Sequence, residues 1–267
     1  MDVDVGVFKG IAGGSNDYAV TLFNLGAIYD FKNGHQTWVN YSEGFDLPDP
    51  AKYYGKAGLS VKDNPLAGIK SRQVETGWRF ADVDWDAQAA IYYIWSDKVI
   101  TTDAATLTID VTDKKSRDFG FEGALTRHFN NGWDAGGTLH LVRSEEEDAQ
   151  GDWMKRDARY ASLSKSTAFV GWHGDGRNVR LQGNHAFTLK DDSDHKISGY
   201  TTFDLMGSQE TEFGTFSAGI QNLLDKEYST VWGQRAALFY SPTYGPEYLY
   251  DYQGRGRTYT MTWSLAY

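Results

Sequence analysis

Side chains alternate between apolar and polar along many segments of this chain, and the last segment shows the pattern most clearly. In residues 257–267, aromatic or aliphatic side chains stand at every second position, with small, mostly hydroxyl-bearing side chains between them. Successive side chains of a β-strand point to opposite faces, so the pattern predicts a strand with one apolar and one polar face. The apolar face fits a lipid membrane, and it also fits the core of a soluble β-sandwich.

The same alternation recurs along the chain in about 11 or 12 segments, with no helical segment predicted between them. The sequence therefore predicts one all-β unit over residues 1–267, an antiparallel up-and-down meander. The predicted strands are residues 18–31, 35–42, 69–80, 84–96, 115–129, 133–143, 165–172, 177–189, 197–206, 213–224 and 257–267, preceded by a short or partial strand at residues 2–8.

Connections between these segments alternate in length. Short turns fall at residues 32–34, 81–83, 130–132 and 174–176, and long loops at residues 43–68, 97–113, 144–164 and 225–256, with a loop hairpin near residues 106–111. Transmembrane barrels place short turns on one rim and long loops on the other, whereas a soluble sandwich has no reason to sort loops by length. The pattern predicts the wall of a transmembrane β-barrel, with polar side chains such as Glu75, Arg79 and Arg180 facing a lumen.

Composition excludes several classes of protein. The absence of cysteine removes disulfides and cysteine nucleophiles, and the net charge of −10 argues against a nucleic-acid partner. No apolar run approaches the roughly 18 residues of a membrane helix. Acidic runs at residues 46–49, 145–148 and 191–194 are interpreted as solvated loops. The first residues carry no export signal, so we expect a mature piece or a fragment.

No catalytic constellation stands out in the sequence. The six histidines are scattered over different segments without the spacing of a metal site, and the glycines near residue 254 are not in a phosphate-loop context. We therefore predict no enzymatic activity, no resident metal and no cofactor.

Residues 219–228, Gly-Ile-Gln-Asn-Leu-Leu-Asp-Lys-Glu-Tyr, resemble the penultimate strand of TonB-dependent outer-membrane receptors. The C-terminal aromatic resembles the assembly signal of outer-membrane barrels. Within that family, residues 43–55, 231–236, 240–245 and 250–258 are similar to the ferric aerobactin receptor branch, which imports hydroxamate siderophores. The likeness runs along essentially the whole chain.

This resemblance implies a fold and a function. Such receptors are 22-stranded barrels with a plug in the lumen, so the chain is expected to be the C-terminal half of the barrel, without the plug. The implied function is uptake of a ferric siderophore, a transported ligand rather than a cofactor, in the outer membrane of a Gram-negative bacterium. The implied partners are the TonB–ExbB–ExbD system acting through the plug, outer-membrane lipid and lipopolysaccharide, and colicins or phages.

The candidate ligand-binding residues are basic and aromatic and lie in two long loops. A ferric hydroxamate bearing citrate-type carboxylates is anionic, so cations would pair with its charge and aromatic rings with its flat surfaces. The alternative is that these aromatics pack within the loops or form the membrane-interface girdle. The predicted set is Tyr53, Tyr54, Lys56, Trp232, Gln234, Arg235, Tyr240, Tyr244, Tyr248 and Tyr250.

Two other functions stay open at this stage. If residues 2–8 supply a twelfth strand, a small barrel closes without a plug and acts as a passive porin-like channel or a structural barrel. A soluble β-sandwich that binds carbohydrate is the other alternative. A half-barrel, by contrast, leaves two strand edges exposed, which is a liability.

Overall fold

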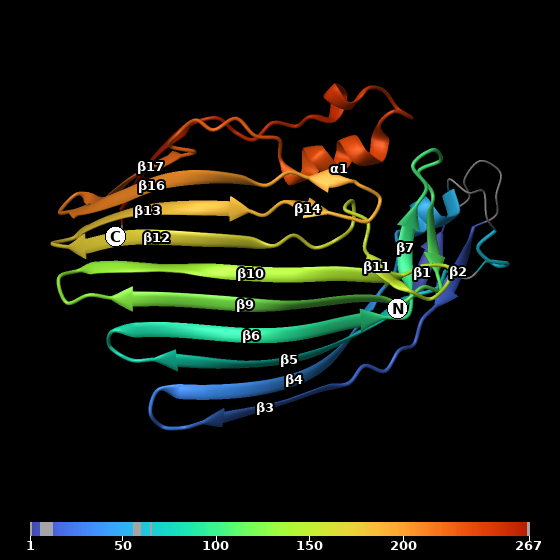
Figure 1. Cartoon of the computed structure of the whole chain (residues 1–267), viewed down its shortest axis with the longest axis horizontal. Helices are drawn as coiled ribbons and strands as arrows, with labels where there is room; N and C mark the ends of the chain where they lie inside the picture. Colours follow the sequence, from blue (N-terminus) through green and yellow to red (C-terminus); the bar gives the residue numbers. More distant parts are fainter. Residues whose placement is uncertain (1, 6–12, 56–59, 65, 266–267) are drawn as a thin grey trace.

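One antiparallel sheet dominates the computed structural model, which describes residues 2–5, 13–55, 60–64 and 66–265 (Figure 1). Eleven of its strands follow one another in sequence order, and short β11 (Trp153–Lys155) lies beside β10. The predicted all-β up-and-down meander is confirmed. The eleven strands are β3 (Asn24–Asp30), β4 (His35–Asp46), β5 (Ile69–Ala81), β6 (Trp85–Ser96), β9 (Ser116–His128), β10 (Trp133–Glu147), β12 (Lys165–Gly174), β13 (Arg177–Ala186), β16 (Tyr200–Thr211), β17 (Gly214–Gln221) and β18 (Thr258–Ser264).

The two ends of the sheet differ as predicted. Tight turns join the strands at one end, while the other end carries long connections with structure of their own (Figure 1). The expected loop hairpin near residues 106–111 exists as β7 (Val99–Thr102) and β8 (Ile109–Thr112). The remaining loop elements are β1 (Asp2–Val5) with β2 (Gly14–Asp17), β14 (Leu189–Lys190) with β15 (Lys196–Ile197), the π-helical turn η1 (Ala51–Gly55), helix α1 (Val231–Tyr240) and the 3-10 turn η2 (Glu247–Tyr250).

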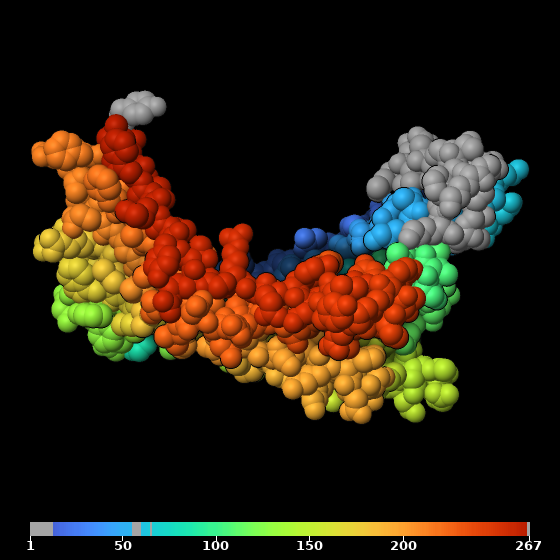
Figure 2. Space-filling view, turned by 90° about the horizontal axis from the view of Figure 1, so that it is seen from above, coloured from blue at the N-terminus to red at the C-terminus, as the bar shows by residue number. Residues whose placement is uncertain are grey.

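The sheet is a single curved wall, hollowed on one side (Figure 2). Its outer face carries rows of large apolar side chains that are widely exposed, for example Leu25 at 76%, Ile91 at 58% and Met261 at 88%. Tyr259 and Trp263 are also more than half exposed. Since no second sheet covers this face in the described part of the chain, the β-sandwich alternative is wrong. A face of this kind fits lipid.

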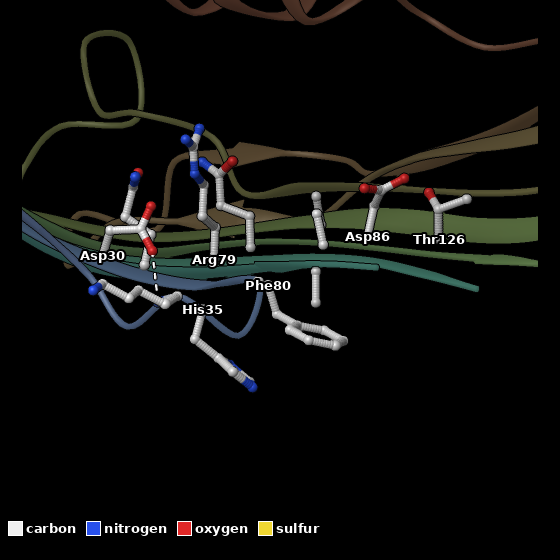
Figure 3. Close-up of a pocket in the computed structure, with 13 residues that line it drawn as sticks. Asp30, His35, Arg79, Phe80, Asp86 and Thr126 are labelled. Atoms are coloured by element: carbon white, nitrogen blue, oxygen red, sulfur yellow. Dashed lines mark hydrogen bonds between the residues drawn. The ribbon is translucent and has the colours of Figure 1, made fainter. Parts of the chain in front are cut away.

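The inner face is polar, as the alternation predicted. Figure 3 shows Arg79, Asp86 and Thr126 projecting on one side of the sheet, while His35 and Phe80 project on the other. The inner side chains line a hollow of about 810 Å³ near the short-turn end. Its lining combines acidic, basic and amide groups, as a water-facing lumen requires.

The two edge strands of the main sheet, β3 and β18, do not pair with each other among the described strands. Both run from the long-loop end to the short-turn end, because eleven antiparallel strands separate them by an even number of reversals. Direct closure would therefore need a parallel seam. The small closed barrel is wrong, and the predicted partial barrel is confirmed as an open sheet.

The predicted twelfth strand at residues 2–8 does not join the wall. Its described part, β1, pairs with β2 in a separate two-stranded sheet, and residues 6–8 lie outside the described residues. The strand predicted at residues 18–31 is also shorter, since β3 begins at Asn24. The Glu43 side chain accepts the Phe23 amide at 3.0 Å, so a carboxylate takes a bond that the strand ladder would otherwise use.

Two further predictions need correction. The loop at residues 225–256 contains a helix, α1, although no helical segment was expected. The acidic run at residues 145–148 is not a solvated loop, because β10 extends through Glu147 and Glu145 is 4% exposed. Asp191, expected in another solvated loop, is 6% exposed. Both carboxylates are buried because they hold hydrogen-bond donors from neighbouring segments.

Side-chain burial is concentrated under the long loops. Tyr54, Val61 and Leu66 form a small apolar cluster, with Tyr18, Tyr53 and Val111 packed against it. None of the helices in the described part of the chain has both the length and the apolar character needed to pass through a bilayer. The chain therefore buries its apolar side chains mainly where loops from different strands meet.

Candidate ligand-binding site

A pocket of about 400 Å³ lies at the long-loop end of the wall. Four connections contribute to it: β4 to β5, β6 to β9, β10 to β12, and β17 to β18. Because the pocket lies at the open mouth of the wall, a ligand arriving from the long-loop end meets it before it meets the inner face. The lining residues are Lys52, Thr102, Leu107, Arg159, Tyr160, Trp232, Arg235, Ala236, Phe239 and Tyr240.

Helix α1 supplies half of this lining. Its pocket residues, Trp232, Arg235, Ala236, Phe239 and Tyr240, follow the spacing i, i+3, i+4, i+7 and i+8 that places side chains on one helical face. The helix begins after Thr230, whose side chain accepts a hydrogen bond from the Gly233 amide at 3.0 Å. This N-cap satisfies a backbone donor that the first helical turn leaves free. One helical face is therefore presented to the pocket as a unit.

The pocket is cationic. Lys52, Arg159 and Arg235 line it, and no carboxylate does in the part of the chain that the structure describes. The whole chain carries a net charge of −10, so this local excess of positive charge is not a consequence of composition. Three cations with aromatic neighbours form a surface that attracts an anion with flat, partly apolar parts.

Arg235 is the most constrained of the three cations. Its Nη2 donates to the carbonyl oxygen of Ala161, while its buried Nε has no hydrogen-bond partner among the described residues. Burial lowers the pKa of the guanidinium, and the nearby Arg156 lowers it further. A buried donor without an acceptor is costly, and the negative charge of an anion in the pocket would relieve the repulsion between the two arginines.

Arg159 is held in place by a carboxylate outside the pocket. Its Nε donates to both oxygens of Asp157, at 2.9 and 3.0 Å, and its Nη2 donates to Oδ2 at 2.5 Å. Hydrogen bonding to Asp157 raises the pKa of Arg159. Burial opposes ionisation of Asp157, yet these bonds hold its pKa below the usual value. The guanidinium is therefore charged and fixed in orientation.

Asp157 also belongs to a group of side chains that connects two loops, which we call the Asp191 tie. It lies with Asp191 and His195 in a group whose possible ligand atoms are all within 4.8 Å. The Asp191 carboxylate accepts hydrogen bonds from the amides of Ala158, Ser193 and His195, each at 2.9 Å, and contacts the His195 ring at 2.9 Å. Because its oxygens are occupied by protein donors, we interpret the group as a structural tie.

The predicted residues of the last long loop fall into three groups. Trp232, Arg235 and Tyr240 line the pocket. Gln234 lies beside it and bonds the backbone of Ser198. The other three, Tyr244, Tyr248 and Tyr250, do not line it: Tyr250 stacks on Tyr240 at 5.4 Å, Tyr244 donates to the carbonyl oxygen of Ala105 at 2.5 Å, and Tyr248 is 75% exposed.

The predicted residues of the first long loop lie apart from the pocket. Tyr54 is 2% exposed, and its hydroxyl oxygen accepts bonds from the Leu66 amide at 2.8 Å and the Asn16 side chain at 2.7 Å. Tyr53 packs edge-on against Tyr54 at 4.9 Å. Lys56 lies outside the described residues. Tyr54 therefore anchors the loop, while the neighbouring Lys52, which was not predicted, reaches the pocket.

Sequence analysis also missed Arg159, Tyr160 and Phe239. Arg159 and Tyr160 form a basic-aromatic pair in the loop at residues 144–164, the same kind of signal that singled out the other two loops. Phe239 follows from the helical spacing with Trp232 and Arg235, which becomes visible once α1 is recognised. Each missed residue thus carried a signal in the sequence.

An open wall of antiparallel strands, apolar outside and polar inside, with a basic and aromatic pocket among its long loops, defines a segment of a membrane β-barrel receptor. The family model described as TonB dependent receptor-like, beta-barrel matches residues 2–223. The chain belongs to the TonB-dependent receptor family. This confirms the resemblance seen in the sequence, and the family places the chain in the outer membrane of Gram-negative bacteria.

Individual relatives agree with this assignment. The ferric aerobactin receptor of Klebsiella pneumoniae is 41% identical over 272 residues, covering 96% of this chain and 37% of that protein. The rhizobactin receptor of Rhizobium meliloti (strain 1021) is 38% identical over 267 residues, covering 94% and 36%. The solved siderophore receptor PiuA from Acinetobacter baumannii superposes with a TM-score of 0.66 at 14% identity, covering 97% and 38%. The chain thus spans little more than a third of these relatives.

Proposed function

We propose that this chain is the C-terminal part of the barrel wall of an outer-membrane receptor for a ferric siderophore of the hydroxamate type. The observation that carries the proposal is the cationic, aromatic pocket between the long loops. Relatives named as aerobactin and rhizobactin receptors support the substrate class. They do not favour the passive porin-like alternative.

The pocket chemistry suits such a ligand. A hydroxamate siderophore built on citrate presents carboxylates, which Arg159, Arg235 and Lys52 would pair with through charge-assisted hydrogen bonds. Trp232 and Tyr240 would cover the flatter surfaces of the complex. The ferric complex is cargo, and no catalytic step is required of the protein.

Import needs parts of the protein beyond this wall. In the complete receptor we expect energy to reach the ligand through TonB, ExbB and ExbD by way of a plug. Lipid and lipopolysaccharide would surround the outer face, and colicins or phages would exploit the exposed loops. Within this scheme the pocket is an early contact for the ligand at the cell surface.

Binding of ferric aerobactin to the full-length protein in detergent tests the proposal. Replacing both arginines, Arg159→Gln with Arg235→Gln, should raise Kd at least roughly 100-fold, since each removes a hydrogen bond to a charged group worth about 1.5–3 kcal/mol. Arg177→Gln, at the opposite end of the wall, is the matched control and should bind like the unmodified protein. Equal affinity of the double variant and the control would contradict the proposal.

A ligand comparison separates charge from shape. An uncharged ferric trihydroxamate lacks the carboxylates that the arginines would hold, so its affinity should change less than about threefold in the double variant. If both complexes lost affinity equally, the arginines would be shaping the loops rather than pairing with the ligand.

A further inference from the structure

Leu107 lines the ligand pocket from the turn between β7 and β8. Its φ is 59°, in the left-handed region that bulky L-residues rarely adopt. The other non-glycine residues with positive φ in the described part of the chain are a lysine, an asparagine and three aspartates. Leu107 is therefore the one apolar side chain held on such a backbone among the described residues.

The hydrogen bonds of the turn fix this backbone without using the leucine side chain. The Leu107 amide donates to the Asp103 carbonyl oxygen at 2.8 Å, and the Asp103 amide donates to the Thr108 carbonyl oxygen at 2.9 Å. The Asp103 carboxylate accepts the amide and the hydroxyl of Thr106 at 2.7 and 2.9 Å. Glycine or asparagine would adopt the same backbone at lower cost, so the turn itself gives no reason for a leucine.

Packing beneath the loops does not account for the leucine either. Val111, from the same hairpin, packs against the apolar cluster of Tyr54, Val61 and Leu66, whereas Leu107 is not part of that cluster. The side chain of Leu107 is half-buried and lines the pocket instead. Strained residues collect at ligand clamps, where the surrounding structure holds them in place. The position of Leu107 therefore points to a contact with a ligand.

The pocket receives apolar side chains from two separate loops. Helix α1 contributes Ala236 and Phe239, and the turn between β7 and β8 contributes Leu107. The hydroxyl of Tyr244, shortly after α1, donates to the Ala105 carbonyl oxygen at 2.5 Å, so the turn is tied to the segment that follows the helix. Leu107 is thus held in a pocket that also contains three cations.

We propose that Leu107 is a specificity-determining residue that packs against the aliphatic carbon chains of the ligand, between its charged groups and its hydroxamates. The inference rests on the proposed function and deepens it, because it assigns the apolar part of the ligand to a residue other than the arginines. Contact between aliphatic groups depends on the buried area and the fit, and it does not depend on charge. Leu107 therefore selects for the carbon chains, whatever charge the ligand carries.

The variant Leu107→Gly in the full-length protein separates ligand contact from turn stability. Glycine removes the side chain and relieves the backbone strain, so hydrogen exchange at the turn amides should not accelerate, while Kd for ferric aerobactin should rise about 5- to 20-fold. Leu107→Met keeps an apolar side chain of similar volume and should bind within about threefold of the unmodified protein. Lys32→Gly, which changes another residue of positive φ at the opposite end of the wall, is the matched control and should leave Kd unchanged.

A second ligand separates this inference from the proposed function. The uncharged ferric trihydroxamate also carries aliphatic chains, so Leu107→Gly should weaken its binding by about the same factor as that of ferric aerobactin. Replacing Arg159 and Arg235 should weaken chiefly ferric aerobactin. Full affinity of Leu107→Gly for either ligand, or faster exchange in its turn, would overturn the role of Leu107. Failure of the unmodified protein to bind ferric aerobactin would instead contradict the proposed function.

Discussion

Gln234 on helix α1 exchanges two hydrogen bonds with the backbone of Ser198, 36 residues earlier in the chain. The Ser198 amide donates to Gln234 Oε1 at 2.6 Å, and Gln234 Nε2 donates to the Ser198 carbonyl oxygen at 3.0 Å. The same Nε2 donates to the Ser229 carbonyl oxygen at 3.0 Å. The Gln234 side-chain amide thus bonds the Ser198 backbone in the way that a neighbouring strand would. These bonds fix the helix that presents Trp232 and Arg235 to the pocket.

Changing Gln234→Glu tests this clamp, because glutamate keeps the shape but loses the donor. Its carboxylate would face two carbonyl oxygens, which is unfavourable. We expect faster hydrogen exchange at the Ser198 amide and roughly three- to tenfold weaker binding of ferric aerobactin. Gln209→Glu, at the short-turn end, is the control. Unchanged exchange at Ser198 would show that the helix is held by other contacts.

The Asp191 tie predicts a pH response of the loops. Burial opposes ionisation of Asp191, but hydrogen bonds from Ala158, Ser193 and His195 outweigh it and lower its pKa. The ordinary pKa of an aspartate is about 3.9, and folding lowers the pKa of Asp191 below that value. At a pH above about 3.9 the ionised carboxylate therefore stabilises the connection between the loops. This stabilisation is lost as the pH falls through the lower pKa of the folded state. The contribution of the Asp191 carboxylate to loop protection should therefore be constant between about pH 5 and 8.

The variant Asp191→Asn removes the charge at neutral pH. Its amide group would face backbone donors, so opening of the loops at residues 148–164 and 187–199 should become easier by about 1–3 kcal/mol. Limited proteolysis at pH 7 should then cut these loops faster while the wall resists. Asp194→Asn is the control, and equal protease resistance of both variants would exclude the tie.

Edge direction leads to a prediction about the isolated chain. β3 and β18 run in the same direction, so pairing them with each other would give a parallel seam. Two copies related by a twofold axis along the barrel would meet at parallel seams for the same reason. A barrel that is antiparallel throughout therefore needs an odd number of further strands between β18 and β3. The isolated chain should give no steady single-channel conductance in a planar bilayer. A reproducible step of constant size would mean that it closes in a way the structure does not show.

Much of the wall could be predicted from the sequence because its signals are local. The alternation in residues 115–129 and 177–189, together with the turn residues between strands, fixes which side chain faces which way. Strand ends were less predictable. β3 begins only at Asn24 because the Glu43 side chain takes the Phe23 amide, although the Phe23 carbonyl oxygen still accepts the Glu43 amide at 3.0 Å. β10 continues through Glu147 because cations across the strand hold the acidic run. Both effects depend on partners distant in sequence.

The pocket was only partly predictable for the same reason. Trp232, Arg235 and Tyr240 stood out by residue type, and the structure brings them together because they share one helical face. Tyr54 carried the same signal yet became a buried anchor, since Leu66 and Asn16 occupy its hydroxyl. Residue type indicates which side chains can bind a ligand, while the convergence of separate loops decides which of them do.

Cysteine scanning of β9 tests most directly whether alternate side chains along each strand meet lipid and water. The chain contains no cysteine, so single substitutions at residues 119–126 report on one position each. In the full-length protein in bilayers, with any cysteine outside this chain replaced by serine, labels at Phe119, Phe121, Gly123 and Leu125 should be quenched by brominated lipid, and those between them by a water-soluble quencher. Quenching without a two-residue period, or labels protected from both quenchers, would contradict the account.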